Sequence, residues 1–160
     1  MTHTFLLEPG RWIIKGNWSE KNQSSIGFKG ATIIRWDQPN WFVMKTKLVF
    51  DSKVRSIATT IKSSSDEHSE LEFEYKGFLP SDKQQYSYVL KRSDFDKIEG
   101  EGWITRQSII QRYWVLGDHR RRSAFETLFQ INENTYHLSS TMIAGNNIMN
   151  VTEGILERHG

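Results

Sequence analysis

The stretch Glu70-Leu-Glu-Phe-Glu-Tyr-Lys76 indicates most directly how this chain folds. Leu71, Phe73 and Tyr75 alternate with charged residues, so a period of two places the apolar side chains on one face and the charged side chains on the other. This pattern is typical of a strand in an antiparallel sheet that has one face toward the core and one toward water. We therefore expect a strand here, with Leu71, Phe73 and Tyr75 facing inward.

The same alternation recurs along the chain and predicts further strands with one buried face. The residues expected to face inward are Phe42, Met44, Thr46, Leu48 and Phe50, then Tyr86, Tyr88 and Leu90, and then Phe125, Thr127, Phe129 and Ile131. On this reasoning Glu126 and Gln130, which alternate with the last group, are expected to face solvent.

Clusters of turn-forming residues separate these stretches, among them Asp37-Gln-Pro-Asn40, Ser63-Ser-Ser-Asp66 and Asn132-Glu-Asn134. They predict about ten strands joined by short turns. Such strands can close into an up-and-down barrel, which removes the exposed edges of an open sheet. We therefore expect an all-β fold, a single closed antiparallel barrel domain spanning residues 1–160 with little helix. A two-sheet sandwich is the alternative, but it usually needs longer crossover loops.

Two segments are harder to interpret. The best helical candidates are the first nine residues and Ser93-Asp-Phe-Asp-Lys97. Between Ile98 and Leu116 no strong turn signal occurs, so either Gly100 and Gly102 bend one long strand or a tight hairpin lies at Thr105-Arg106-Gln107. We favour the hairpin.

Composition narrows the function classes. The 160 residues carry 21 Lys and Arg against 19 Asp and Glu, a formal net charge of +2, which argues against a nucleic-acid partner. There are no cysteines, as expected in a reducing compartment, and we expect a cytoplasmic protein without a membrane span. The histidines show no zinc-site spacing and no catalytic motif is recognisable, so we expect no metal and no cofactor, and we favour a non-enzymatic protein over an enzyme.

Gly10-Arg11-Trp12, placed where the first strand should open, resembles the Gly-x-Trp signature of the calycins. This superfamily includes lipocalins, fatty-acid-binding proteins and nitrobindin-like barrels. The resemblance implies a barrel whose end is closed by the tryptophan packed on an arginine from the last strand, which would be Arg158 here. A helix after the last strand is not predicted, which brings the chain nearer to the ten-stranded, helix-poor relatives. The resemblance also implies a ligand in the barrel interior.

Candidate ligand-binding residues follow from the faces assigned inward. Tyr75, Tyr86, Tyr88 and Tyr136 would give an interior an apolar wall with hydrogen-bonding tips. Arg112 and Trp114 share one face of the stretch 108–116, and an inward Arg112 would need an anionic partner such as a ligand carboxylate. The opposite face, which carries Gln111 and Tyr113 (with Ile109 and Val115), is equally apolar, so the pattern does not choose between them.

Three functional hypotheses result. The leading one is a carrier or sensor that binds a small hydrophobic or amphipathic ligand, or an acidic one held by Arg112, inside the barrel. The second is an isomerase, lyase or hydrolase acting in the same cavity, with Glu126 and His137 as acid and base and Ser139 or Ser140 as nucleophile. The third is a non-catalytic interaction protein whose barrel is filled by its own side chains and whose outer surface meets a partner. A homodimer is a separate expectation.

Overall fold

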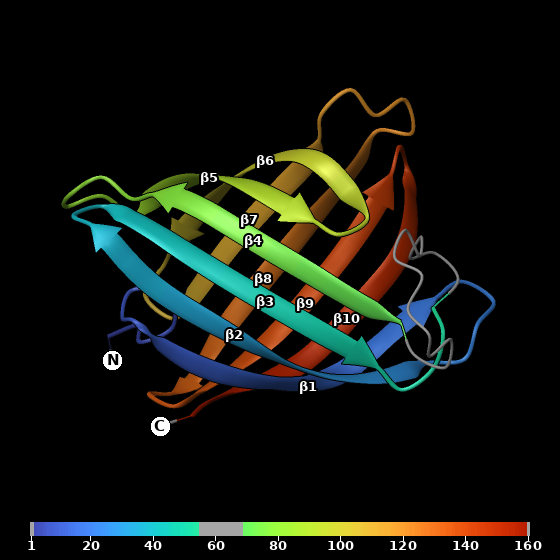
Figure 1. Ribbon diagram of the computed structural model, residues 1–160, viewed down its shortest axis with the longest axis horizontal. Coiled ribbons are helices and arrows are strands. Elements are labelled where there is room, and N and C mark those ends of the chain that lie inside the picture. The colour runs from blue at the N-terminus through green and yellow to red at the C-terminus, as the bar shows by residue number, and fades with distance from the viewer. Residues whose placement is uncertain (1, 55–68, 160) are drawn as a thin grey trace.

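The computed structural model describes residues 2–54 and 69–159, which form ten strands (Figure 1). The strands are β1 (Gly10–Glu20), β2 (Ile26–Gln38), β3 (Trp41–Phe50), β4 (Glu70–Phe78), β5 (Gln85–Arg92), β6 (Phe95–Ile104), β7 (Ser108–Val115), β8 (Arg122–Asn132), β9 (Thr135–Ala144) and β10 (Asn147–Arg158). The turn expected at Ser63-Ser-Ser-Asp66 lies outside the described residues.

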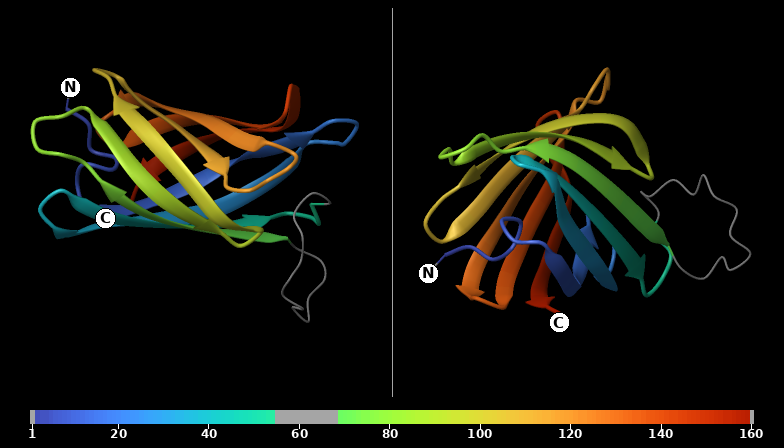
Figure 2. Two further views of the ribbon diagram at one scale, coloured as in Figure 1. Left: turned by 90° about the horizontal axis from the view of Figure 1, so that it is seen from above. Right: turned by 60° about the vertical axis from the view of Figure 1, so that its left-hand side comes forward.

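The strands form one closed antiparallel barrel, as expected (Figure 2). Each strand pairs with its neighbours in sequence, and β1 pairs with β10 to complete the ring. The up-and-down topology confirms the barrel and rules out the sandwich. Because the ring is closed, it leaves none of the ten described strands with an unpaired edge.

Trp12 and Arg158 lie directly opposite each other in the register of β1 and β10. The guanidinium carbon of Arg158 is 6.0 Å from the centroid of the Trp12 ring, a cation–π distance. Arg158 also forms an ion pair with Glu8, at 3.5 Å between nitrogen and oxygen. The expected pairing of Trp12 with Arg158 is therefore confirmed, and it lies at the seam where the barrel closes.

The N-terminal residues cover the end of the barrel at which both termini lie (Figure 1). The Phe5 ring meets Trp12 edge to face with the centroids 5.4 Å apart, and Trp12 meets Tyr136 in the same way at 5.5 Å. This segment forms a turn rather than the helix considered above, and Ser93 and Asp94 form the turn before β6. The described part of the chain contains no helix that could cross a membrane.

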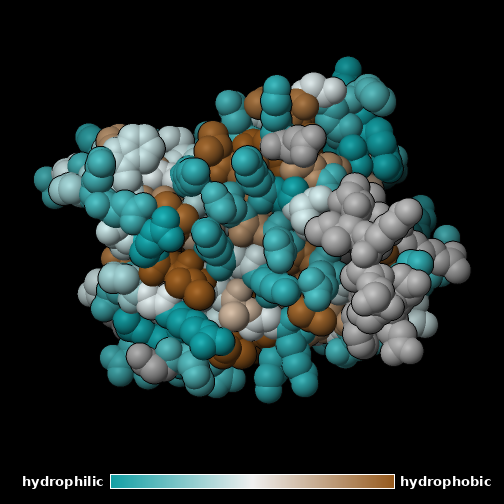
Figure 3. Space-filling model, in the orientation of Figure 1, coloured by the Kyte–Doolittle hydropathy of each residue, from teal (hydrophilic) through white to brown (hydrophobic). Residues whose placement is uncertain are grey.

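The inward faces of β3, β4 and β5 are those predicted from alternation. Phe42, Leu71 and Tyr88 are among the buried residues, and Lys45 and Lys47 face outward. On the outer side Lys45 lies 3.8 Å from Glu74 and Lys47 lies 3.5 Å from Glu70. Figure 3 shows that hydrophilic side chains cover most of the surface in this view, with separate hydrophobic patches between them.

The prediction for β8 is wrong. Phe125 and Phe129 are 49% and 42% exposed, and Ile131 is exposed as well. The buried side chains of this strand are Ala124, Glu126, Leu128 and Gln130. Because β8 carries apolar residues on both faces, its own pattern does not determine its orientation; pairing with β7 and β9 does.

The hairpin preferred at residues 105–107 is confirmed, since β6 ends at Ile104 and β7 begins at Ser108. Gly100 and Gly102 in β6 have a different role from the bend considered above. Tyr88 lies opposite Gly100 and Tyr86 opposite Gly102, and each tyrosine ring lies over its glycine. A Cβ atom at Gly102 would come within 2.0 Å of Tyr86 Cζ, so only glycine leaves room for the ring.

We therefore expect Gly102→Ala to destabilise the protein by about 1–3 kcal/mol, because the added methyl group displaces a buried ring. Gly10→Ala is the matched control, since its Cβ would meet nothing closer than 3.7 Å, and its effect should stay within about 0.5 kcal/mol. Urea unfolding of the three proteins measures both values. Equal stability of the two variants would show that the ring does not need the glycine.

Candidate functional site

One row of residues runs across several strands at the same level of the barrel interior. Tyr86 lies opposite Gly102, and successive register partners are Gln111, Glu126, Ser140 and Thr152. Residues directly opposite each other on neighbouring strands point to the same side of a sheet. All members of this row therefore face the interior, and each is fixed by the strand on either side.

Hydrogen bonds connect this row into what we call the Glu126 network. The Tyr86 hydroxyl donates to Gln111 Oε1 at 2.7 Å, and Gln111 Nε2 donates to Glu126 Oε1 at 2.7 Å. Ser140 Oγ donates to Glu126 Oε2 at 3.0 Å. The missing side chain at Gly102 allows the Tyr86 ring to cross β6 and reach Gln111. Each carboxyl oxygen of Glu126 therefore accepts a hydrogen bond, one from Gln111 and the other from Ser140.

Glu126 is 8% exposed, and burial raises the pKa of its carboxyl group above the ordinary 4.5. The hydrogen bonds from Gln111 and Ser140 and the positive charge of Arg92 act in the opposite direction without outweighing burial. The neutral acid is therefore present at higher pH than in an exposed glutamate. A neutral carboxyl group can donate a hydrogen bond as well as accept one.

Arg92 is the second buried charged residue of the interior, and its donors have partners. Its Nε and Nη2 donate to the two carboxylate oxygens of Asp94, each at 2.9 Å, and Nη1 donates to the Tyr113 hydroxyl at 2.8 Å. The guanidinium carbon also lies 5.1 Å and 4.9 Å from the ring centroids of Phe73 and Phe95. The charge of Arg92 is thus already compensated within the protein.

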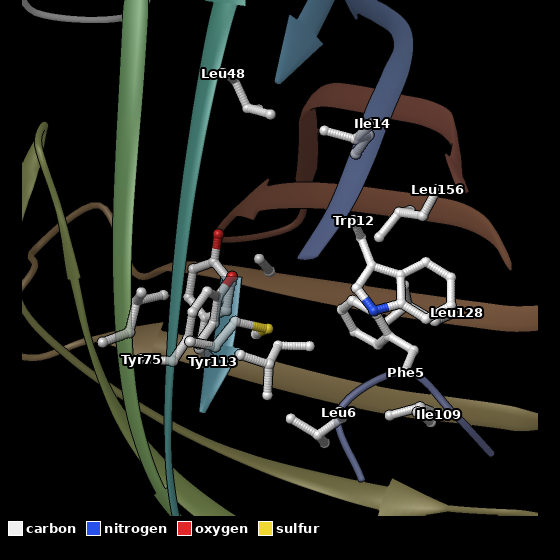
Figure 4. Packing of buried hydrophobic residues seen from close by; sticks show 14 of the residues in the cluster. Phe5, Leu6, Trp12, Ile14, Leu48, Tyr75, Ile109, Tyr113, Leu128 and Leu156 are labelled. Carbon is white, nitrogen blue, oxygen red and sulfur yellow. The ribbon is translucent and has the colours of Figure 1, made fainter. Parts of the chain in front are cut away.

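Between these groups lies a cavity of about 80 Å³. Its polar side includes Glu126, Gln111, Ser140 and Tyr75. Its apolar side is formed by Ile14, Met44, Leu48, Leu128, Met142 and Leu156. Figure 4 shows Tyr75 and Tyr113 in this interior, with Phe5 and Trp12 packed together farther along it.

Tyr75 contributes a hydroxyl group without a hydrogen bond to any other described residue, although the side chain is buried and lines the cavity. Burial raises its pKa well above 10.0, with the nearby Glu126 acting in the same direction. The phenol therefore stays neutral. It offers both a donor and an acceptor to whatever occupies the cavity.

The four tyrosines predicted to face inward are all buried, but they do different things. Tyr75 lines the cavity, and Tyr86 belongs to the Glu126 network. The Tyr88 hydroxyl donates to the backbone oxygen of Arg112 at 3.2 Å. Tyr136 lies at the covered end of the barrel, 2.7 Å from His3 Nδ1. Of these four tyrosines, only Tyr75 and Tyr86 therefore belong to the cavity lining or to the Glu126 network.

Of the two orientations left open for the stretch 108–116, the one that places Arg112 and Trp114 in the interior is wrong. The Arg112 side chain is 60% exposed, lies 3.6 Å from Glu101 and stacks over Trp114 at 5.0 Å from the ring centroid. The opposite face of β7 points inward, because Tyr113 pairs with Gly100 and Ala124 in the interior. Arg112 therefore cannot hold a ligand in the cavity.

The proposed acid–base pair is also not assembled. His137 lies toward the outside of β9, 3.4 Å from Glu153, whereas Glu126 faces the interior. Of the two serine candidates only Ser140 lines the cavity. Sequence reasoning missed Gln111, Glu126 and Ser140 as a group. The available signal was Tyr86-Ser-Tyr88 opposite Gly100-Glu-Gly102, a large-over-small pattern that sets the inward face of β6.

Comparison with known proteins identifies the fold but no family. No family model and no curated protein matches the chain. A structure of Rv2717c from M. tuberculosis superimposes with a TM-score of 0.68 at 10% identity, covering 99% of this chain and 100% of that one. A structure of the S-type phycobiliprotein lyase CPES from Guillardia theta gives 0.58 at 8% identity, covering 96% and 89%. At these identities the likenesses show a shared barrel fold.

The raised pKa of Glu126 predicts a pH dependence of stability. Between the unfolded-state pKa of about 4.5 and the higher folded-state value, the folded protein binds more protons than the unfolded chain. The free energy of unfolding contributed by this group therefore falls as pH rises through that window. It falls by about 1.4 kcal/mol for each unit of separation between the two pKa values.

Glu126→Gln removes this titration while preserving the shape and the acceptor for Gln111. We expect the wild-type protein to lose stability relative to this variant between pH 4 and pH 8 in urea unfolding. Glu72→Gln, on the exposed face of β4, is the control and should run parallel to the wild type. A parallel course for Glu126→Gln as well would contradict the raised pKa.

Proposed function

We propose that the barrel binds a small amphipathic molecule in its interior cavity. The observation that supports this most strongly is the pair of buried polar groups facing the cavity, the Tyr75 hydroxyl and the Glu126 carboxyl. The Tyr75 hydroxyl faces the cavity and has no hydrogen-bond partner among the described residues. A ligand in the cavity can therefore donate a hydrogen bond to it or accept one from it.

The apolar side of the cavity would hold the other part of the ligand. Met44 and Met142 contribute flexible side chains that can adapt to its shape. Pockets for drug-sized ligands span about 300–1,000 Å³ and a cavity that holds benzene about 150 Å³, so a cavity of about 80 Å³ admits a short chain, and admits one ring only when flexible side chains around it move. A long fatty acid would need the interior to expand.

An acidic ligand is less well supported than the sequence suggested. Its expected anchor, Arg112, lies outside the barrel, and Arg92 is already bound to Asp94 and Tyr113. Glu126 would repel a carboxylate when ionised. The charges of the described interior therefore favour a ligand without a negative charge.

A second candidate function is catalysis in the same cavity, in line with the lyase among the similar structures. The specific observation is Glu126 itself, a carboxyl group with a raised pKa in a cavity, which is the condition for a general acid. Ser140 and Tyr75 would orient the substrate beside it. Turnover of a ligand found by binding, lost in Glu126→Gln, would support this function over simple binding.

If a ligand binds in the cavity, it should raise the Tm of the protein. Filling the cavity with a larger side chain should prevent this shift. At a ligand concentration of 100 times Kd the stabilisation is about 2.7 kcal/mol, which raises Tm by about 5–10 °C for a protein of this size. A panel of small neutral, cationic and anionic aromatic and aliphatic compounds, followed by thermal unfolding, measures the shift.

Ala124→Leu should abolish that shift, because Ala124 lines the cavity and the larger side chain fills it. Ala31→Leu adds the same atoms on the outer face of β2 and should retain the shift. Ligand-induced shifts that are equal in both variants would place binding outside the barrel and contradict the proposal.

A further inference from the structure

The positive and negative charges around the cavity do not balance when Glu126 is ionised. Of the described residues that line it, only Arg92 and Glu126 are ionisable to a charge near neutral pH. Asp94 pairs with Arg92 through two hydrogen bonds, and both side chains are buried. This pair is neutral as a whole. Ionised Glu126 would therefore leave the interior with one negative charge that no described cation neutralises.

We propose that the cavity selects ligands carrying a protonated amine, which forms an ion pair with the Glu126 carboxylate as the carboxyl proton leaves to solvent. This inference rests on the proposed function, since it names the chemistry of the ligand for that same site. Charge is balanced because one ammonium group enters as one proton departs.

The hydrogen-bonding geometry fits an ammonium group. Gln111 occupies one acceptor position on Glu126 Oε1 and Ser140 one on Oε2, so each carboxylate oxygen retains further acceptor capacity. The Tyr75 hydroxyl, with no described partner, can accept a further bond from an ammonium group, which has three donors. The apolar wall opposite would hold the hydrocarbon part. A carboxylate would find no uncommitted cation in these surroundings.

Glu126 is the group whose proton would be released. Burial raises its pKa and so favours the protonated form. The other ionisable groups that act electrostatically on it or respond to its charge are Arg92, Tyr75, Tyr86, Tyr88 and Tyr113. Burial raises the pKa of all four phenols, and Arg92 remains protonated, so none of these changes charge near neutral pH. Affinity for the amine should therefore rise with pH until the amine itself loses its proton.

The test compares three probes of similar size, benzylamine, benzyl alcohol and benzoate, by calorimetric titration at pH 7. We expect the wild-type protein to bind benzylamine at least tenfold more tightly than benzyl alcohol and to bind benzoate weakest. Titrations in two buffers of different ionisation enthalpy count the released protons, and up to one per bound benzylamine is expected, with none for benzyl alcohol.

Glu126→Gln should bind benzyl alcohol as the wild type does and lose both the preference for benzylamine and the proton release. Glu72→Gln is the matched control with the same change of charge on the outer surface, and it should behave as the wild type. The comparison of the three probes on the wild-type protein stands even if Glu126→Gln does not fold.

The outcomes separate the two proposals. If benzyl alcohol binds as tightly as benzylamine, or benzoate binds most tightly, amine selection is overturned while ligand binding in the interior stands. If benzylamine is preferred equally in Glu126→Gln, the assignment to Glu126 is overturned. If none of the probes binds, the proposed function fails for ligands of this size, and amine selection fails with it.

Discussion

The pairing of β1 with β10 is the constraint on which the rest of the structure depends. Once the ring of strands is closed, the register of each strand is tied to both neighbours, and there is only one interior. A residue then faces inward because its partners do, whatever its own strand would prefer. Glu126 lies inside because Gln111 and Ser140, its partners on β7 and β9, lie inside.

Aromatic rings that pack over glycines on neighbouring strands leave room for the cavity beside Glu126. Tyr86 and Tyr88 lie over Gly102 and Gly100, and Phe42 lies over Gly77 in the same way. Rings that lie flat over a neighbouring strand occupy the wall rather than the centre. This arrangement brings the Tyr86 hydroxyl to Gln111 and leaves space in front of Glu126. The packing of the Tyr86 ring over Gly102 and the hydrogen bonds of the Glu126 network therefore depend on each other.

The sequence predicts strands well where one face is charged and poorly where both faces are apolar. The stretch 70–76 carries glutamates on one side, so its inward face is unambiguous, and the Gly-x-Trp resemblance correctly paired Trp12 with Arg158. In β7 and β8 both faces are apolar, so the inward face of β7 stayed open between Arg112 and Gln111, and Glu126 was expected outside although it lies inside. The site depends on those two strands. Their orientation is set by pairing within the closed barrel, so the sequence of either strand alone does not predict it.

The two described cavity-lining residues that can carry a charge near neutral pH, Arg92 and Glu126, are stabilised by different means. Arg92 keeps its charge because Asp94, two residues away, accompanies it into the interior and binds it through two hydrogen bonds. Glu126 has no such companion among the described residues; burial favours its neutral carboxyl form, which accepts hydrogen bonds from Gln111 and Ser140 and costs less to bury than the carboxylate. Ionising Glu126 in this interior therefore costs more than ionising an exposed glutamate. A cation placed beside the carboxylate would lower that cost, since an opposite charge nearby favours the ionised form.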